Sequence, residues 1–212
     1  MTNKFDYTNE VVMAHDEYQE TRDQIVEAAR EVFAKYGYRK ATIEDISSAV
    51  YKAKSSVYHY FKGKDDIFKA VVEKEASHLL HAMRDAVDRE QDPVTKFRTL
   101  FKFMIMEMAE KHNYYHFLKD EWFLIFNFTI DVRKTFENLI ISMFVSIFNE
   151  GNRQGIFDIN DPETDAKAMQ ISLSGFITPW GNFGGGDIID MVDPFLDIIL
   201  NGLIKRPDVV AD

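Results

Sequence analysis

The chain has 212 residues, a formal net charge of −10, 46% hydrophobic residues and no cysteine. Its length suits one large domain or two small ones, and its apolar content excludes a disordered chain. The absence of cysteine excludes disulfides and thiol chemistry. We find neither a secretory signal nor an apolar run of the roughly 20 residues that a membrane helix needs. We therefore expect a cytoplasmic protein without a membrane partner.

The first part of the chain predicts two helices after a tail. Residues 1–16 show no sustained apolar period, and we expect a mobile N-terminal tail there. From Tyr18 the apolar residues follow a helical spacing, which ends at Gly37 in the C′ position, where a left-handed conformation is usual. Thr42 is expected to cap a second, short helix, with Asp45 at its third position.

A third short helix is predicted from about Lys54 to Tyr60, followed by an interruption at Gly63. Two short helices joined by a tight turn, behind a longer helix, are typical of a helix-turn-helix unit. The second helix of such a pair lies in the DNA major groove. We therefore expect a DNA-binding domain over 17–64 and a second domain over 65–212.

The second domain is predicted to consist of helices throughout. Aspartate–proline pairs at 92–93 and 161–162 read as helix starts, since proline is favoured at the first helical position. No segment alternates with a period of two for long enough to be a strand. The expected helices cover 65–89, 93–111, 112–128, 131–154, 162–179 and 187–205, with a loop at 181–186. The fold class is therefore all-α, with about nine helices.

Basic residues gather in one short part of this acidic chain. Between Lys35 and Lys64 there are seven basic residues and two acidic ones, a net charge of +5 that leaves −15 for the rest. A small basic face on an acidic body suits a protein that touches nucleic acid with one region. The alternative is a chance cluster of solvated lysines.

The segment IVEAAREVFAKYGYRKATIEDISSAVYKAKSSVYHYFKGKDDIFKAVV resembles the N-terminal domain of the tetracycline-repressor (TetR) family of bacterial transcription regulators. The anchors are AA..VFA..GY..ATIEDI and VYHYFKGKDDIF. The resemblance implies a homodimeric repressor that binds a near-palindromic DNA operator and is released by a small effector, without a cofactor. It also implies the DNA-binding residues, which we take as Thr42, Lys52, Lys54, Ser55, Ser56, Tyr58, His59, Lys62 and Lys64.

The sequence departs from the family pattern at the turn. The usual run is Ala-Gly-Val-Ser, and this chain has Val50, Tyr51, Lys52 and Ala53. Tyr51 replaces a glycine that relieves backbone strain, and Ala53 replaces a helix-capping serine. Either the turn relaxes to another geometry and Lys52 adds a phosphate contact, or DNA binding is weakened.

The second domain is rich in aromatic residues and methionine. Core packing explains most of them, but part of the set is expected to line a cavity for an apolar or aromatic effector. The expected ligand-binding residues are Phe97, Phe101, Met104, Met108, Trp122, Phe126, Phe144, Phe148 and Phe176. The last two helices resemble the pair that forms a four-helix dimer interface in the family, through Ala166, Met169, Leu173, Phe176, Ile177, Phe195, Leu196, Ile199, Leu200 and Leu203.

Two other classes of function stay open. A DNA-binding regulator without a small ligand fits the same residues. An enzyme or a metal-dependent sensor is the second alternative, although no nucleophile motif appears and we expect no metal site. The histidine pairs at 78/81 and 112/116 have helical ligand spacing, which is common on helix surfaces.

Overall fold

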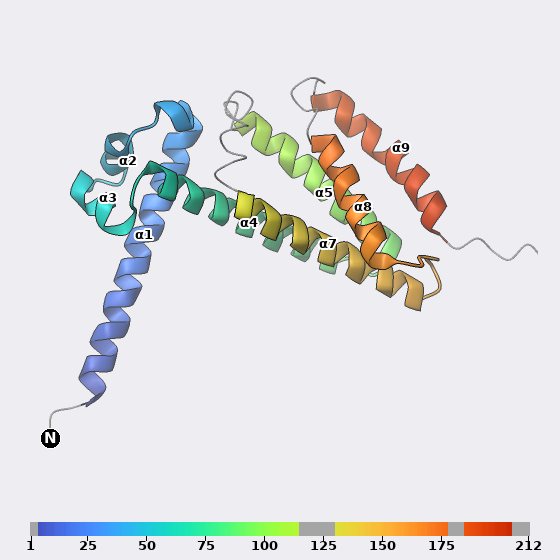
Figure 1. The fold of residues 1–212 in the computed structure, drawn as a ribbon, viewed down its shortest axis with the longest axis horizontal. Helices are drawn as coiled ribbons and strands as arrows, with labels where there is room; N and C mark the ends of the chain where they lie inside the picture. The colour runs from blue at the N-terminus through green and yellow to red at the C-terminus, as the bar shows by residue number, and fades with distance from the viewer. Residues whose placement is uncertain (1–3, 115–129, 178–184, 205–212) are drawn as a thin grey trace, which may run out of the picture. The chain divides into compact units, whose positions relative to one another are not determined.

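The computed structural model describes residues 4–114, 130–177 and 185–204, and the side chains of 15–107, 130–173 and 190–204. These residues form eight α-helices (Figure 1) and, apart from one isolated bridge between Phe157 and Ile204, no β-structure. The all-α prediction is confirmed. The expected helix over 112–128 lies largely outside the described residues, which accounts for the difference from nine.

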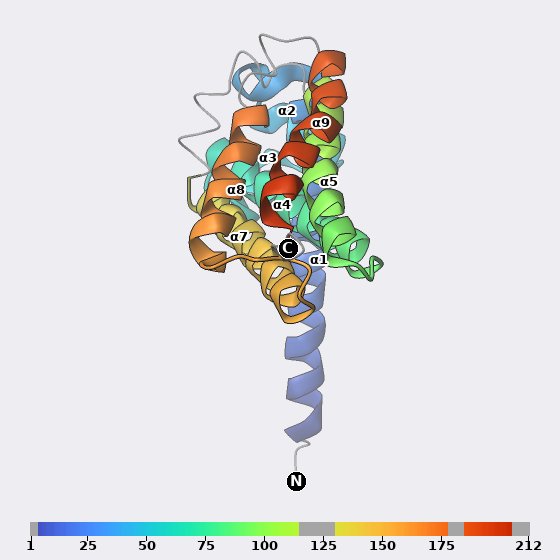
Figure 2. The ribbon, with the colours of Figure 1, turned by 90° about the vertical axis from the view of Figure 1, so that its right-hand side faces the viewer.

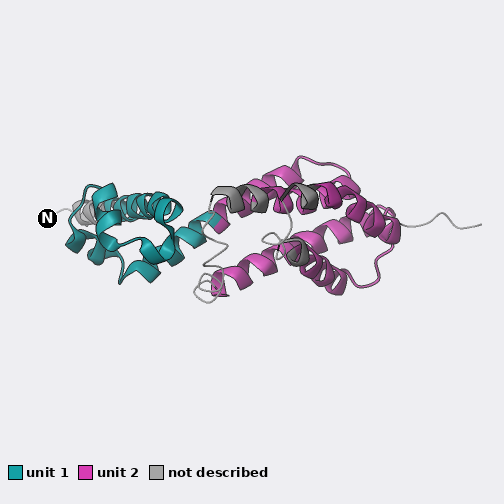
Figure 3. Cartoon of the chain, turned by 90° about the horizontal axis from the view of Figure 1, so that it is seen from above, with its two compact units in different colours: residues 1–75, 115–129 teal, residues 76–114, 130–212 magenta. Residues whose placement is uncertain are grey.

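The chain divides into two compact units, 1–75 with 115–129, and 76–114 with 130–212 (Figure 3). The division falls within one helix, α4 (Lys64–Asp88), whereas the expected domain boundary lies at 64–65. The reason is packing, since Ile67, Phe68 and Val71 in the first turns of α4 belong to the core of the first unit.

The first unit contains α1 (Lys4–Lys40), α2 (Ile43–Ala49), α3 (Lys54–Tyr60) and the first part of α4. The apolar face of α1 forms one side of its core, and the shorter helices cover that face. The largest fully buried side chains of this core are Ile25, Phe33, Ile46 and Ile67.

The expected N-terminal tail over 1–16 is helical from Lys4 onward. No glycine or proline precedes Gly37, so nothing in the sequence stops the helix from extending toward the N-terminus. Gly37 has the expected positive φ, 78°, but its ψ of 162° is extended and not left-handed helical, so α1 is kinked at Gly37 before its last residues, 38–40.

Both ends of α2 are closed by local hydrogen bonds. The Asp45 backbone N–H donates to Thr42 Oγ1 over 3.1 Å, and the Thr42 N–H donates to Asp45 Oδ2 over 2.9 Å, so the predicted capping box is confirmed. At the C-terminus the N–H groups of Tyr51 and Lys52 donate to the carbonyls of Ser48 and Ser47, 3.2 and 2.9 Å away. These two bonds define a Schellman motif with Tyr51 at C′.

The second unit contains the rest of α4, with α5 (Pro93–Tyr114), α7 (Ile130–Arg153), α8 (Pro162–Ile177) and α9 (Gly185–Leu203). Helices α7 and α8 lie side by side, and α5 contacts α7, α8 and α9 (Figures 1 and 2). The predicted starts of α5 and α8 are confirmed. Asp92 Oδ2 and Asp161 Oδ1 accept hydrogen bonds from backbone N–H groups three residues later.

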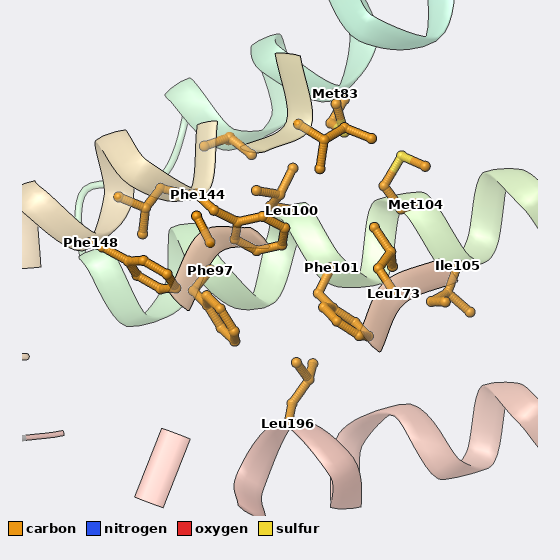
Figure 4. Close-up of a cluster of buried hydrophobic side chains, with 14 of the residues drawn as sticks. Met83, Phe97, Leu100, Phe101, Met104, Ile105, Phe144, Phe148, Leu173 and Leu196 are labelled. Atoms are coloured by element: carbon orange, nitrogen blue, oxygen red, sulfur yellow. The ribbon is translucent and has the colours of Figure 1, made fainter. Parts of the chain in front are cut away.

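The core of this unit is a stack of aromatic side chains (Figure 4). The Phe97 ring centroid lies 5.6 Å from that of Phe144 and 5.9 Å from that of Phe148. Phe101 continues the stack toward α9, with its ring centroid 5.5 Å from that of Phe195. The first four of these rings are fully buried, so close packing of aromatic side chains holds the unit together.

Two glycines shape the end of α7. A Cβ on Gly151 would lie 2.1 Å from the buried ring of Phe157, so only glycine lets the chain fold back this closely. Gly155 has φ 70°, and its N–H and that of Ile156 donate to the carbonyls of Asn152 and Gly151. The helix therefore ends in the same Schellman motif as α2, here with glycine at C′.

The last helix begins earlier than expected. α9 starts at Gly185, inside the loop that we predicted over 181–186. It contains Pro194, which the sequence left as either a restart or a kink, and one helix spans it. Salt bridges tie α9 to α5, including Lys102 Nζ to Asp193 Oδ1 at 2.6 Å.

Candidate nucleic-acid interface

The short helix α3 presents polar side chains at its N-terminus. Lys54 and Ser55 are exposed and Ser56 is half-buried, while Val57 one position later is buried in the core of the first unit. Tyr58 is 48% exposed. This helix therefore presents hydroxyl, ammonium and phenol groups outward, which is the chemistry that contacts phosphates and base edges.

Lys54 has a partner within the unit. Its Nζ forms a salt bridge with Glu44 Oε1 on α2 and lies 6.0 Å from the centroid of the Tyr58 ring. The hydrogen bond with Lys54 lowers the pKa of Glu44, and the same bond raises the pKa of Lys54. Glu44 was not among the expected site residues, and sequence spacing gave no sign that it meets a lysine ten positions later.

Lys64 has contacts of another kind. Its Nζ donates to the carbonyl oxygens of Tyr38, Arg39 and Ala41 over 2.7, 3.3 and 3.0 Å. These carbonyls follow Gly37, where the regular part of α1 ends. The ammonium group thus closes the end of α1, and the phosphate contact that the family resemblance implies for Lys64 stays a prediction.

The aromatic residues of α3 divide between two surroundings. Tyr58 faces outward with Lys54, whereas the rings of His59 and Tyr60 contact each other and Tyr18 on α1. His59 remains exposed and Tyr60 is half-buried. Tyr18 was not among the expected site residues, although its spacing to the buried Ile25 places it on the core-facing side of α1.

The other expected DNA-binding residues lie around α3. Thr42 is exposed, but its hydroxyl donates to the carboxylate of Asp45 over 2.6 Å as part of the capping box. Lys52 is half-buried and Lys62 is exposed. The backbone of the turn between α2 and α3 has not relaxed, because Tyr51 keeps φ 53°. The phosphate contact expected of Lys52 in the first of our two alternatives stays a prediction.

Ala53 leaves the N-terminus of α3 without a side-chain cap, as expected from the sequence. The first free amides of that helix have no hydroxyl or carboxylate partner from position 53. The second alternative, that this turn weakens DNA binding, stays a prediction.

Five of the nine expected ligand-binding residues lie among the described side chains, all in the second unit. Phe97, Phe101, Met104, Phe144 and Phe148 are all buried in its core and pack on one another (Figure 4). The remaining four lie outside the described side chains, namely Met108, Trp122, Phe126 and Phe176. Their role as an effector site stays a prediction.

A cavity of about 300 Å³ lies elsewhere in the second unit, between α4, α5 and α7. Its polar lining includes Arg84, Asp88 and the salt bridge between Lys96 and Glu150, whose Nζ and Oε2 are 2.7 Å apart. None of the five expected ligand-binding residues whose side chains the structure describes lines this cavity. Its charged lining differs from the apolar site that we expected.

The residues expected at a dimer interface do not share one environment. Ala166, Leu173, Leu196 and Leu200 are at most 2% exposed and belong to the core of their own unit. These helices instead expose other apolar residues, and Ile171 on α8 and Ile198 on α9 are 69% and 74% exposed. Helical periodicity in the sequence identifies the apolar residues of α8 and α9, but it does not show which of them remain exposed once the helices have packed.

The described part of the chain has neither a membrane helix nor a metal site. Within it, no helix has the length and hydropathy to cross a membrane. No three histidine, aspartate or glutamate side chains converge there as a metal site. His78 and His81 are both exposed, and the side chains of His112 and His116 lie outside the described residues.

Comparisons with a protein family, with similar sequences and with solved structures give the same assignment. Residues 25–71 match the family of bacterial regulatory proteins named tetR. The transcriptional regulator QacR of Staphylococcus aureus is 28% identical over 193 residues, which cover 87% of this chain and 98% of QacR. The similarity to QacR therefore extends through both units and is not confined to the DNA-binding one.

Solved structures share the fold over most of the chain. A TetR-family regulator from Pectobacterium atrosepticum has a TM-score of 0.72 at 20% identity and covers 91% of this chain and 98% of its own. The regulator FadR of Bacillus subtilis, solved in complex with stearoyl-CoA, has a TM-score of 0.64 at 19% identity and covers 84% and 97%. The match over residues 25–71 and the similarity to QacR through both units support a helix-turn-helix transcriptional regulator of the tetR family of bacterial regulatory proteins.

Proposed function

We propose that this protein is a homodimeric repressor that binds a near-palindromic DNA operator through α3 and releases it when a small apolar effector binds the second unit. The observation that carries the proposal is the exposed lysine and hydroxyl surface of α3 in a unit that matches the family. The protein is then a regulator and not an enzyme, and it acts in the cytoplasm, where the DNA lies.

Charge supports DNA as the partner. The segment from Lys35 to Lys64 has a net charge of +5 in a chain of −10. Phosphate contacts supply most of the affinity of such proteins, and acidic surfaces elsewhere discourage other orientations on DNA. Lys52, Lys54 and Lys62 are the proposed phosphate contacts, with Tyr58 beside them.

The DNA prediction is tested by selecting duplexes from a random pool and titrating the selected duplex at several salt concentrations. Lys54→Ala should weaken binding and reduce the slope of log K against log salt by about 0.9 for each lysine lost, or about 2 for a dimer. Lys134→Ala, on the exposed surface of α7, is the matched control and should change neither quantity. An unchanged slope for Lys54→Ala contradicts the proposed interface.

Dimerisation is proposed through the outer faces of α8 and α9. Ile171 and Ile198 are large apolar residues that are mostly exposed on these two helices. A two-fold dimer would set two copies of α3 about one DNA turn apart, which suits a near-palindromic operator. Burying such residues in a second copy removes their apolar surface from water.

The double variant Ile171→Glu/Ile198→Glu should therefore sediment as a folded monomer. Met106→Glu, at a methionine that is 60% exposed on α5, is the control and should remain dimeric. A dimer that survives the double substitution rules out this face. Substitutions at Leu173 or Leu200 would not test it, since both are buried within the protomer.

An apolar effector is supported by the aromatic and methionine content of the second unit and by the fold itself. The same fold holds stearoyl-CoA in Bacillus subtilis FadR, so it accommodates a long apolar chain. Phe101, Met104 and Phe144 are the described residues that we place nearest to an effector. The alternative, a regulator without a small ligand, predicts that no metabolite alters DNA binding.

A thermal-unfolding screen separates these two cases. It uses acyl-CoA thioesters, steroids and uncharged aromatic compounds as probes, each also tested for release of the selected duplex. An effector that binds the folded protein raises the unfolding temperature by mass action. A compound that stabilises the protein supports the switch only if it also lowers the affinity for DNA. Because coupling between two sites is reciprocal, such a compound must itself bind the DNA-bound protein more weakly than the free protein.

A further inference from the structure

The recognition helix, α3, is weakly held at its N-terminal end. It has seven residues, and Ala53 before it makes no side-chain capping bond. The preceding turn contains Tyr51 at φ 53°, a conformation that costs energy for any residue but glycine. Helices this short are unstable on their own, so contacts with neighbouring helices must set the orientation of α3.

Helix α2 supplies part of those contacts, and one face of α1 supplies aromatic and cation–π contacts. Val57 and Phe61 of the α3 segment are 0% and 2% exposed. The guanidinium carbon of Arg22 on α1 lies 4.9 Å from the Phe61 ring centroid. Arg22 therefore covers the end of α3, and the next residue on the same face of α1, four positions earlier, is Tyr18.

Tyr18 extends this face of α1 by one turn and reaches two rings of α3. Its ring centroid lies 4.7 Å from that of Tyr60 and 6.0 Å from that of His59. The rings of His59 and Tyr60 are 5.2 Å apart at 89°. Each ring of this cluster contacts the other two, so the cluster resists rotation of α3 about its own axis.

We propose that Tyr18 is a positioning residue that fixes the orientation of the recognition helix against α1. The proposal rests on the DNA binding proposed above, and Tyr18 lies outside residues 25–71, which the family comparison matches. Tyr18 acts through His59 and Tyr60, and these residues hold the outward-facing Lys54 and Tyr58 in register with the DNA.

The charges around Tyr18 favour packing over direct contact with DNA. The neighbouring side chains Asp16, Glu17, Glu20 and Asp23 are all exposed. An acidic surface is repelled by phosphates, so this part of α1 has no electrostatic attraction to DNA. The ring of Tyr18, rather than its hydroxyl, is then the group that matters.

The test compares Tyr18→Ala, Tyr18→Phe and Tyr36→Ala in the full-length protein. Tyr36 is the matched control, because it is another tyrosine of α1, 44% exposed, and none of its described ring contacts involves α3. Each variant is titrated with the selected duplex and with a random duplex of the same length, and its unfolding is followed by circular dichroism.

Loss of two aromatic contacts should lower the affinity of Tyr18→Ala for the selected duplex by about tenfold. Its affinity for the random duplex should change by less than about twofold, because non-specific binding depends on phosphate charge and not on the orientation of α3. Tyr18→Phe keeps the ring and should bind like wild type, as should Tyr36→Ala.

Three results would overturn the proposal. Wild-type affinity in Tyr18→Ala shows that the cluster does not orient α3. An equal loss in Tyr18→Phe shows that the hydroxyl contacts DNA directly. An equal loss on both duplexes shows general unfolding of the unit instead of misorientation. If the wild-type protein selects no duplex at all, the proposed function itself fails, and that outcome is seen before any variant is made.

Discussion

Replacing Tyr51 by glycine is expected to stabilise the DNA-binding unit. Tyr51 occupies the C′ position of the Schellman motif that ends α2, and its φ is 53°. Both hydrogen bonds of the motif require this positive φ, so the backbone cannot relax without losing them. The side chain is 97% exposed, so its removal gives up almost no packing.

Two opposing terms set the size of the effect. A non-glycine residue in the left-handed region costs about 1–2 kcal/mol, and glycine removes that cost. Glycine also gives the unfolded chain more freedom, which lowers stability by about 0.4–1 kcal/mol. The balance is a net stabilisation of about 0.5–1 kcal/mol for Tyr51→Gly.

The end of α7 provides the reverse experiment in the same chain. Gly155 occupies the same C′ position with φ 70°, and no atom lies within 4 Å of where its Cβ would be. Gly155→Ala therefore introduces strain without a clash. We expect it to destabilise the second unit by about as much as Tyr51→Gly stabilises the first, about 0.5–1 kcal/mol.

Urea unfolding of the two variants and of Tyr51→Ala measures these differences. Tyr51→Ala retains a Cβ and should be nearly as stable as wild type, which separates the backbone effect from loss of the ring. If Tyr51→Gly is no more stable than Tyr51→Ala, the strain argument fails, and the positive φ at Tyr51 carries no measurable cost.

Two more predictions follow from single contacts. Glu44→Gln should release Lys54 and raise affinity for the selected duplex by about two- to fivefold in titrations at neutral pH. The hydrogen bond with Lys54 lowers the pKa of Glu44. Wild type and variant should therefore bind the duplex with equal affinity only as the pH falls through that lowered pKa and Glu44 becomes neutral. A difference in affinity that persists below it refutes the pairing. Gly151→Ala should lower the free energy of unfolding by about 1–3 kcal/mol, because its Cβ would enter the Phe157 ring. Gly202→Ala, with open space around it in α9, should be neutral or stabilise by up to about 1 kcal/mol, and equal effects at the two glycines would contradict the close-approach argument.

Local chemistry in the sequence was enough to locate most helix ends. Thr42 with Asp45, and the aspartates before Pro93 and Pro162, start helices where predicted. These signals act between residues at most four positions apart, so they are readable without the fold. The same reasoning missed the helical conformation of 4–16, because a polar helix without an apolar stripe leaves no periodic signal.

The sequence by itself determined the all-α class, the helix-turn-helix unit and the lysines in and beside its recognition helix. Only the tertiary structure decided which groups meet, since Lys64 bonds carbonyls more than twenty residues away and Lys54 meets Glu44 on another helix. It also decided that Leu173 and Leu200 are buried in their own protomer while Ile171 and Ile198 are exposed. The physical reason is that helical periodicity defines a face, whereas the packing of whole helices decides what covers that face.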